Sequence, residues 1–365
     1  MRSEKSFTLI ACFLLSIYYL LLSVFSLMKT ISVIIANLNG EQYLPDCLRS
    51  LEAQTFKDFE VIVVDNGSSD SSLDILRSDF PWARVIALKE NTGFAGGNNI
   101  GFAASSAEYV ATLNNDTIAD RSWLQALYET AKTDASVGMV ASKIYLGREG
   151  NEIDSAGMLL YPDGMTRQRG HGEEDKGQFD SVKEVLFPSA CAALYRHEML
   201  RQTGYFDEDF FSYCEDADLG LRGRLAGWKA VLAPKASVRH LYSQTSGSYS
   251  EFKAFHVERN HFWVLLRDLP LSYIMLFPFY TAWRYIIQVY GLLSGRGSVA
   301  RFAEKAGPGQ MLGIVFRAYW AAVKALPRTL GKRRRTWKAK RIGNKEYINV
   351  LRRHRITARE LMLRD

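Results

Sequence analysis

The sequence predicts an α/β protein built around a doubly wound, mostly parallel β-sheet. Two observations carry this prediction. Short apolar, β-branched segments alternate with helical patterns between residues 31 and 141, and this alternation is typical of right-handed βαβ units. The apolar segments are also continuous, as expected for strands buried on both faces.

The expected elements follow one another closely. We expect strands at residues 31–36, 59–64, 84–88, 109–113 and 137–141, and helices at 41–54, 70–79, 95–104 and 122–132. Residues 147–183, rich in Gly, Asp, Glu and Arg, form an excursion before a second half. That half opens with a strand leading into residues 189–191, followed by a helix near 197–203 and another that begins with the acidic residues 215–218.

The composition excludes several classes of protein. Hydrophobic residues make up 47% and charged residues 23% of the 365 residues, which is globular rather than disordered composition. Four scattered cysteines without a C-x-x-C spacing predict neither disulfides nor a zinc site. Much of the net charge of +7 lies after residue 320, but no recognition motif accompanies it, so we expect no nucleic-acid partner.

The N-terminal segment, residues 1–30, contains an uncharged run at 7–28 that follows Arg2 and Lys5. This run is long enough to cross a bilayer, which takes ~20 helical residues. Three interpretations are open: a membrane anchor, a cleaved signal peptide, or an upstream extension before a start at Met28. We favour the anchor because no small-x-small cleavage site precedes residue 31.

Polar residues follow the expected strands, where ligands bind in sheets of this kind. Asp65 ends the second strand, and its carboxylate can accept the imide N–H of uracil or thymine. Gly67 permits a tight turn beside it. The alternative is that Asp65 caps the next helix, although Ser69 or Asp70 can fill that role.

A glycine-rich turn at residues 90–99 leads into the third helix. Glycines there let backbone N–H groups approach a ligand, and a helix start favours phosphate. The spacing is neither G-x-G-x-x-G nor that of a P-loop, which excludes a dinucleotide-binding dehydrogenase and a P-loop NTPase. Close packing of this helix is the alternative reason for its small residues.

Asp116 follows the fourth strand in the sequence Asn114-Asn115-Asp116. A divalent cation that bridges a diphosphate needs few protein ligands, because phosphates and waters complete its octahedron. His240, just after another apolar strand, is a candidate second ligand, and a structural role is the alternative.

The densest acidic cluster lies at residues 215–218, Glu-Asp-Ala-Asp. Group transfer to a hydroxyl needs a general base that takes the hydroxyl proton. An aspartate beside other carboxylates at a partly buried helix start has a raised pKa suited to this role. A negatively charged helix cap is the alternative.

Together these segments resemble glycosyltransferase family 2, with the GT-A fold, and within it the bacterial branch that includes rhamnosyltransferases. Five ordered motifs within residues 31–245 carry the resemblance: SVIIANLNG at 32–40, VVDNGSSD at 63–70, NTGFAGGNN at 91–99, LNNDT at 113–117 and FDEDFFSYCEDADL at 206–219. The resemblance implies a GT-A catalytic domain at 31–260 with an acceptor-side extension, and an apolar then basic helical region at 261–365.

The resemblance also implies roles for individual residues. Asp216 is the catalytic base, with Glu215 beside it. Asp116 ligates Mn or Mg, and His240 is a second ligand or a diphosphate contact. The implied donor-binding residues, of which the first three surround the nucleotide base, are Asn37, Asn39, Asp65, Asn91, Gly93, Gly97, Asn98 and Asn115.

Two departures refine the expected activity. The first carboxylate of the family's D-x-D motif is replaced by Asn114, which weakens metal binding in the absence of donor. The Q-x-x-R-W motif of processive synthases is missing from the sequence, so addition of a single sugar is favoured over polymerisation.

The apolar stretch at residues 271–293 contains Pro278 and Arg284. A charge near the centre of a membrane span costs ~2.5–3.5 kcal/mol on insertion scales. We therefore expect a helix at the membrane interface or a broken hairpin, with the basic residues 332–341 attracted to anionic lipid. A core helix packed on the catalytic domain is the alternative. The aromatic residues expected at headgroup depth are Tyr280, Trp283, Tyr285 and Tyr290.

The function implied is an inverting glycosyltransferase that moves a sugar, such as rhamnose, from a nucleoside-diphosphate donor. The acceptor is a glycan or a polyprenyl-diphosphate-linked glycan in cell-surface polysaccharide synthesis, at the cytoplasmic face of the bacterial inner membrane. One alternative is a nucleotidyltransferase, which residues 37–40 disfavour because they contain no Lys or Arg. The other is a non-catalytic glycan- or lipid-binding protein of the same fold, which the intact Asp116 and Glu215-Asp216 disfavour.

Overall fold

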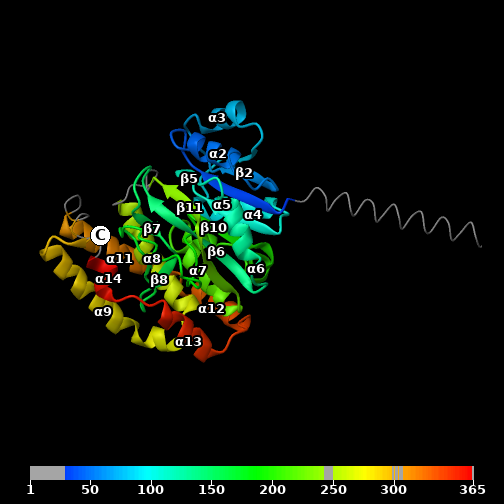
Figure 1. Cartoon of the computed structure of the whole chain (residues 1–365). Coiled ribbons are helices and arrows are strands. Elements are labelled where there is room, and N and C mark those ends of the chain that lie inside the picture. The colour runs from blue at the N-terminus through cyan, green and yellow to red at the C-terminus, as the bar shows by residue number, and fades with distance from the viewer. Residues whose placement is uncertain (1–28, 242–249, 298–299, 301–302, 304–306, 364–365) are drawn as a thin grey trace, which may run out of the picture.

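The computed structural model describes residues 29–241, 250–297, 300, 303 and 307–363 (Figure 1). The N-terminal run at 7–28, for which we expected an anchor, lies outside these residues. The described chain contains a nine-stranded sheet with the order β3-β2-β1-β4-β10-β6-β11-β5, and β7 pairs with β6. A separate pair is formed by β8 and β9.

The strands β1 (Ile31–Asn37), β2 (Phe59–Asp65), β3 (Arg84–Ala87), β4 (Tyr109–Leu113), β6 (Val137–Leu146) and β11 (Lys229–His240) run in one direction. The strands β5 (Thr117–Ala119), β7 (Ile153–Ser155) and β10 (Ala192–Arg196) run the opposite way. The short strands β8 (Met158–Leu160) and β9 (Thr166–Gln168) make up the small sheet. The main sheet is therefore mixed but mostly parallel, as expected.

Helices cover both faces of this sheet. The helices α2 (Leu44–Glu52), α3 (Ser72–Asp79) and α5 (Trp123–Ala131) pack on one face, and α4 (Gly93–Ala104), α6 (His197–Thr203), α7 (Glu215–Leu225) and α8 (Glu251–Asp268) pack on the other. Side chains alternate along each strand to serve both cores. In β1, Val33 and Ile35 face the first core and Ile34 faces the second.

The small residues of α4 bring this helix close to the sheet. A Cβ atom at Gly101 would lie 2.2 Å from Cγ2 of Ile34, and one at Gly97 would lie 3.2 Å from Cβ of Ala36. Close packing, which was the alternative reason for glycines in this helix, therefore accounts for these two. It also places the helix start beside the ends of β1 and β2.

Some expected boundaries shift for local reasons. The first two helices begin at Leu44 and Ser72 rather than at residues 41 and 70. Glu41 N–H donates to the Asp70 carboxylate at 2.9 Å, and the Glu41 carboxylate accepts from Ser71 N–H at 2.9 Å. These bonds tie the two preceding turns together and keep both residues out of the helices.

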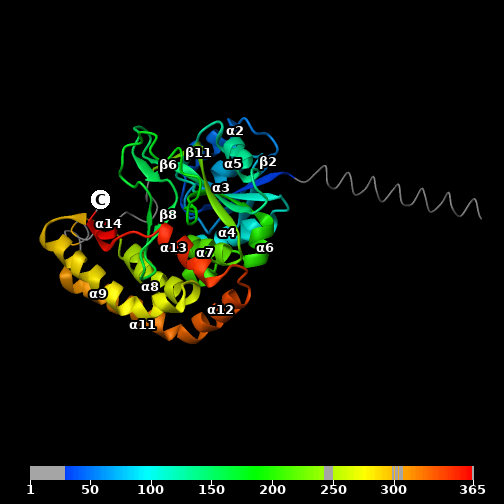
Figure 2. The same cartoon turned by 60° about the horizontal axis from the view of Figure 1, so that its bottom comes forward.

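The C-terminal region forms a helical layer on the α7–α8 side of the molecule (Figure 2). Its members are α9 (Leu271–Leu293), α11 (Pro308–Lys324), α12 (Leu326–Lys338), α13 (Asn344–Arg353) and α14 (Ala358–Leu363). The helix α9 continues through Pro278, so the expectation of a broken hairpin is wrong. Within the described ranges, no helix combines the length and apolar character needed to cross a membrane.

Arg284, the charge within α9, faces the protein and is fully buried. Its guanidinium lies 2.7 Å from the Asp163 carboxylate and 3.0 Å from that of Glu258. Tyr280 and Tyr285 also turn inward: the ring of Tyr280 packs on a neighbouring tyrosine, and Tyr285 Oη donates to Glu258 at 3.2 Å. These two aromatic residues therefore do not occupy the position expected for headgroup contact.

Part of the basic stretch is also used internally. Lys332 pairs with Asp207 and Asp209 in the segment before α7, and Arg333 donates to the Leu266 and Leu269 carbonyls at 2.8 Å. Lys332 and Arg333 therefore stabilise the fold, and attraction of the rest of the stretch to anionic lipid stays a prediction. The exposed basic residues that remain in α12 include Arg334, Arg335 and Lys338.

Candidate functional site

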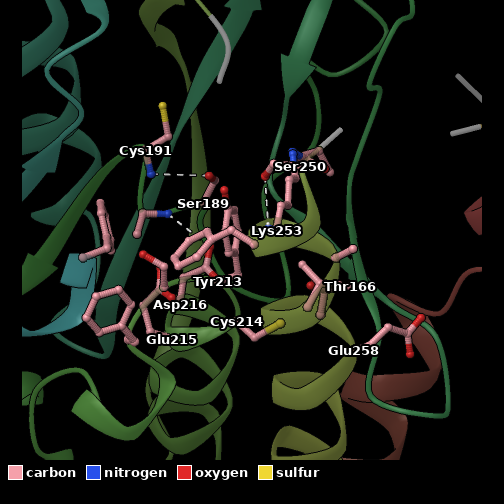
Figure 3. Close-up of a pocket in the computed structure, with 18 of the residues that line it drawn as sticks. Thr166, Ser189, Cys191, Tyr213, Cys214, Glu215, Asp216, Ser250, Lys253 and Glu258 are labelled. Atoms are coloured by element: carbon pink, nitrogen blue, oxygen red, sulfur yellow. Dashed lines mark hydrogen bonds between the residues drawn. The ribbon is translucent and has the colours of Figure 1, made fainter. Parts of the chain in front are cut away.

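A cavity of about 940 Å³ lies at the carboxyl ends of the parallel strands. Eight of the twelve residues expected at the site line it: Asn37, Asn91, Gly93, Asn115, Asp116, Glu215, Asp216 and His240. The other four, Asn39, Asp65, Gly97 and Asn98, do not. The carboxyl ends of the strands and the start of α7 thus line one cavity. Figure 3 shows Glu215 and Asp216 of α7 in this cavity together with Ser189 and Cys191.

Asp65 is fully buried behind the cavity wall. Its two carboxylate oxygens accept from Asn37 Nδ2 at 3.0 Å and from Ser68 N–H at 3.0 Å. Asn37 Oδ1 in turn accepts from Asn115 Nδ2 at 2.7 Å. This network fixes the amides of Asn37 and Asn115 at the cavity. Asp65 does not line the cavity and holds the Asn37 amide from the protein interior.

The glycine-rich turn is held by Asn66, a residue that sequence reasoning missed. Asn66 Nδ2 donates to Asn91 Oδ1 at 3.0 Å and to the Gly93 carbonyl at 2.9 Å, and Asn66 Oδ1 accepts from Thr92 N–H at 2.9 Å. Gly93 has φ +76°, and a Cβ atom there would lie 2.4 Å from the Phe211 carbonyl oxygen. Glycine is thus required where this turn meets the segment before α7.

The remaining predicted donor residues have other surroundings. Asn39 is exposed, and its side-chain oxygen accepts from Ser69 N–H at 2.8 Å. Asn98 Nδ2 donates to the Phe94 carbonyl within α4 at 2.9 Å. A role of Asn39, Gly97 or Asn98 in donor binding stays a prediction that this geometry does not favour.

Asp116 and His240 meet because β5 and β11 pair. His240 is opposite Thr117 in this antiparallel pair, and Leu241 N–H donates to the Asp116 carbonyl at 2.9 Å. As a result His240 Nε2 lies 3.4 Å from Asp116 Oδ1. Two side chains far apart in the sequence therefore face one point of the cavity.

Asp154, which sequence reasoning also missed, orients His240 from behind. Its carboxylate lies 2.8 Å from His240 Nδ1 and 3.0 Å from His171 Nδ1. Burial alone would raise the pKa of Asp154, but the hydrogen bonds from His171 and His240 outweigh it and lower that pKa to about 2. The ionised Asp154 fixes the His240 ring so that Nε2 faces Asp116.

The pair Asp116 and His240 fits a divalent cation. Two neighbouring ligands of an octahedral Mg²⁺, each ~2.1 Å from the ion, are about 3 Å apart, close to the observed 3.4 Å. A histidine that meets a carboxylate through its second ring nitrogen is the usual arrangement in metal sites. No cluster of three or more His, Cys, Asp or Glu ligands occurs among the described residues. A cation here therefore depends on oxygen ligands from a substrate and from water.

Glu215 and Asp216 occupy the first turn of α7 on the other side of the cavity. Burial raises the pKa of Asp216 to about 6, although N–H groups of Ala190 and Ala217 donate to its carboxylate at 3.3 and 2.8 Å. Burial, followed by the charge of Asp216, raises the pKa of Glu215 well above its usual range. Asp216 can thus take up a proton near neutral pH, as a general base must.

The backbone before α7 is strained. Phe211, Tyr213 and Cys214 have φ values of +63°, +70° and +66°, which non-glycine residues rarely adopt. Asn260 of α8 holds this segment: its Nδ2 donates to the carbonyls of Phe210, Ser212 and Tyr213 at 3.0, 2.9 and 2.7 Å. Asn260 therefore sets where α7, and with it Asp216, begins.

The expected strand that leads into residues 189–191 starts only at Ala192. Ser189, Ala190 and Cys191 line the cavity instead, and Ala190 N–H serves the Asp216 carboxylate. Because the Ala190 N–H donates to Asp216, it is not available for a hydrogen bond within the sheet.

Comparison with known proteins identifies related sequences. Residues 32–204 match the sequence profile described as "Glycosyl transferase family 2". An uncharacterized glycosyltransferase of Nostoc sp. is 36% identical over 129 residues, which cover 34% of this chain and 40% of the relative. Poly-beta-1,6-N-acetyl-D-glucosamine synthase of Staphylococcus aureus is 24% identical over 281 residues, which cover 72% of this chain and 64% of the relative. The chain thus spans less than two thirds of the length of these relatives.

Solved structures share the fold. That of S. aureus TarS in complex with UDP-GlcNAc has a TM-score of 0.54 at 19% identity and covers 89% of this chain and 91% of that one. That of GalNAc-T7 with UDP, GalNAc and Mn2+ has a TM-score of 0.53 at 15% identity and covers 66% of this chain and 48% of that one. At such identities the likeness concerns the fold alone.

The Asn260 contacts generate a first prediction. Asn260→Ala leaves three backbone carbonyls without their side-chain donor, and we expect the free energy of unfolding to fall by about 2–3 kcal/mol. Asn98→Ala is the matched control, because the amide of this buried asparagine donates to one carbonyl of its own helix, and we expect a loss of about 1 kcal/mol. Urea denaturation measures both, and equal losses would contradict a special role of Asn260.

Proposed function

The chain belongs to glycosyltransferase family 2 over residues 32–204 and has a GT-A-like fold, and on this premise we propose its activity. It transfers a single sugar, with inversion, from a nucleoside-diphosphate donor to a hydroxyl of a glycan or polyprenyl-diphosphate-linked acceptor in cell-surface polysaccharide synthesis. The observation that carries the proposal is Asp216, a carboxylate of raised pKa that lines one cavity with Asp116 and His240. Rhamnose is the donor sugar to test first, because the five motifs together resemble the bacterial branch that includes rhamnosyltransferases.

We place the donor at the carboxyl ends of the parallel strands. Asn37 and Asn115 offer amide groups to the nucleotide, supported from behind by Asp65. The turn at Asn91 and Gly93 begins α4, whose N-terminus favours the negative charge of a diphosphate. Among solved structures with this fold, that of GalNAc-T7 contains UDP and that of TarS contains UDP-GlcNAc, which is a donor of the proposed class.

Asp116 and His240 are the residues that would hold Mn²⁺ or Mg²⁺. When bound there, the cation neutralises the charge of the leaving diphosphate. The GalNAc-T7 structure, which has this fold, contains Mn2+. Asp154 keeps His240 Nε2 turned toward Asp116, so the two protein ligands are in position before donor binds.

Asp216 acts on the acceptor. Its carboxylate takes the proton of the acceptor hydroxyl while the hydroxyl oxygen bonds to the anomeric carbon of the donor sugar. The bond between that carbon and the diphosphate oxygen breaks, and the nucleoside diphosphate leaves with the bonding electron pair. The N–H groups of Ala190 and Ala217 hold the Asp216 carboxylate during this step.

We also propose that the protein binds the inner membrane at its cytoplasmic face through the outer faces of α9 and α11. Exposed large apolar side chains are concentrated there, and exposed Arg334 and Arg335 of the adjoining α12 would add attraction to anionic lipid. A soluble protein rarely exposes an apolar surface of this extent to water. The apolar surface consists of Leu271, Met275, Leu276, Phe279, Trp283, Ile286, Val289, Tyr290 and Leu293 of α9, and of Leu312, Phe316, Trp320 and Val323 of α11.

Asp216→Asn tests the proposed activity. We expect release of nucleoside diphosphate, measured with Mn²⁺, a panel of nucleotide sugars and a lipid-glycan extract, to fall by about 10²–10⁴-fold. Binding of nucleoside diphosphate should stay within about twofold, because Asp216 lies on the acceptor side. Glu215→Gln is the matched variant: a larger loss there than in Asp216→Asn assigns the base to Glu215. No turnover and no nucleotide binding by the wild type would reject the function.

The pKa of Asp216 predicts a pH profile. The base must be ionised, so kcat/KM should fall as pH decreases through about 6, approaching tenfold per pH unit below it. The raised pKa of neighbouring Glu215 makes the observed midpoint a property of the pair. A rate that stays constant down to pH ~4.5 would indicate a base with the ordinary aspartate pKa.

Membrane binding is measured by co-sedimentation of a chain starting at Met28 with vesicles that contain anionic lipid. Trp283→Glu, at a side chain 54% exposed on α9, should weaken binding by about tenfold or more, because the carboxylate would enter the headgroup boundary. Trp82→Glu is the control, since this tryptophan is 42% exposed but lies between α3 and β3. Equal effects of the two changes would reject α9 as the lipid-facing surface.

A further inference from the structure

The cavity that contains Asp216 continues into an apolar chamber among the C-terminal helices. This part lies beyond the donor residues and is built from the β8–β9 hairpin, α8, α11 and α14. Its apolar lining includes Met165, Val257, Met311, Ile314, Val315 and Met362. A glycan needs hydrogen-bond partners for its hydroxyl groups, which these side chains do not supply.

The chamber wall is part of the protein interior rather than an open surface. Ile314 is 2% exposed, and Met165 and Met362 are each 8% exposed. Methionine side chains are unbranched and adjust their shape to an apolar ligand. An apolar chain that enters gains dispersion contacts with such a wall on several sides.

Two charged groups in the wall, Arg284 and Glu258, are paired with each other. Arg284 and Glu258, which also line the cavity, lie 3.0 Å apart, and Arg284 makes a second ion pair with Asp163. Because these charges already satisfy one another, they do not require a charged ligand.

Two cationic side chains, Lys253 and Arg167, also line the cavity. Lys253, in the first turn of α8, lies across the cavity from Asp216 (Figure 3). Thr166, which Figure 3 also labels, is the first residue of β9. Arg167 follows Thr166 and donates to the Leu361 carbonyl of α14 at 3.0 Å. Burial lowers the pKa of Lys253, and the charge of Asp154 opposes this shift. A phosphate beside Lys253 would stabilise its charged form.

The same helix borders both the chamber and the proposed membrane surface. Ile314 and Val315 of α11 line the chamber, whereas Leu312 and Phe316 are exposed on the outside. An apolar chain held between these positions would remain close to the lipid phase from which it comes.

We propose that this chamber binds the apolar chain of an acceptor in which a phosphate joins the chain to the glycan. The phosphate lies near Lys253 and Arg167, and the reacting hydroxyl lies at Asp216. The inference rests on the proposed function for the role of Asp216, and it selects the lipid-linked acceptor over a free glycan. An isoprenoid and a straight alkyl chain share the required chemistry.

Binding of simple lipid phosphates tests the chamber without requiring turnover. Full-length protein in one mild detergent is titrated calorimetrically with farnesyl phosphate, dodecyl phosphate, isopentenyl phosphate and inorganic phosphate. Farnesyl or dodecyl phosphate should bind at least about tenfold more tightly than isopentenyl phosphate, because burial of each added CH₂ is favourable. Preference for farnesyl over dodecyl phosphate identifies the isoprenoid, and the reverse identifies the alkyl chain.

Two matched variants locate the binding site. Val315→Trp fills part of the chamber and should weaken farnesyl phosphate binding about tenfold or more, whereas Val323→Trp makes the same change on the exposed side of α11 and should leave it within about twofold. A benzophenone-tagged farnesyl phosphate should label Met165, Met311 or Met362, assigned to single residues by fragmentation, which supports the site even if Val315→Trp unfolds.

Two results would overturn the inference: equal affinity for farnesyl and isopentenyl phosphate, or labelling confined to the outer faces of α9 and α11. Either result leaves the proposed function intact if Asp216-dependent turnover is observed. Conversely, chamber binding without turnover of any nucleotide sugar would remove the function and keep the lipid site.

Discussion

The bonds from Asn260 to the segment before α7 determine where Asp216, the proposed base, faces the cavity. Three residues there have left-handed backbone angles, and each such residue costs of order 1–3 kcal/mol. The two hydrogens of the Asn260 amide serve three carbonyls, so they restrain consecutive peptide units at once. With these units fixed, the chain can turn sharply into α7 and present Asp216 to the cavity, while the Phe211 carbonyl meets the glycine turn that begins α4.

The C-terminal helices are therefore part of the site rather than an addition to it. Asn260 belongs to α8, and Asp207, which precedes the strained segment, pairs with Arg267 of α8 and Lys332 of α12. These ion pairs, together with those of Asp209, account for acidic residues beyond the number that a helix cap requires. Any movement of α8 or α12 would change the distance between Asp216 and the residues proposed to bind the donor, such as Asn37 and Asn115 at the ends of β1 and β4.

Local patterns were sufficient for much of the sheet and for the positions of Asp116 and Asp216, because strand ends and acidic helix starts are visible within a few residues. The pairing of Asp116 with His240 depends on β5, whose three residues are too short to give a pattern. Asn66, Asp154 and Asn260 act through side-chain bonds to distant segments, and no neighbouring sequence distinguishes them. The neighbouring residues also do not indicate that Arg284 faces the protein interior, since its partners Asp163 and Glu258 are distant in the sequence.

Two buried aspartates in this region, Asp154 and Asp216, differ in pKa because their hydrogen-bond partners differ. Asp154 is buried yet has a pKa of about 2, because two histidines donate to it. The Asp216 carboxylate accepts from the backbone N–H groups of Ala190 and Ala217, but burial outweighs these bonds and raises its pKa to about 6. The first environment keeps a permanent negative charge behind His240, which suits a cation site. The second allows a proton to be gained and lost near neutral pH, which suits a base. The protein thus keeps a permanently charged carboxylate behind His240 and a titratable one at Asp216, the residue that we propose as the base.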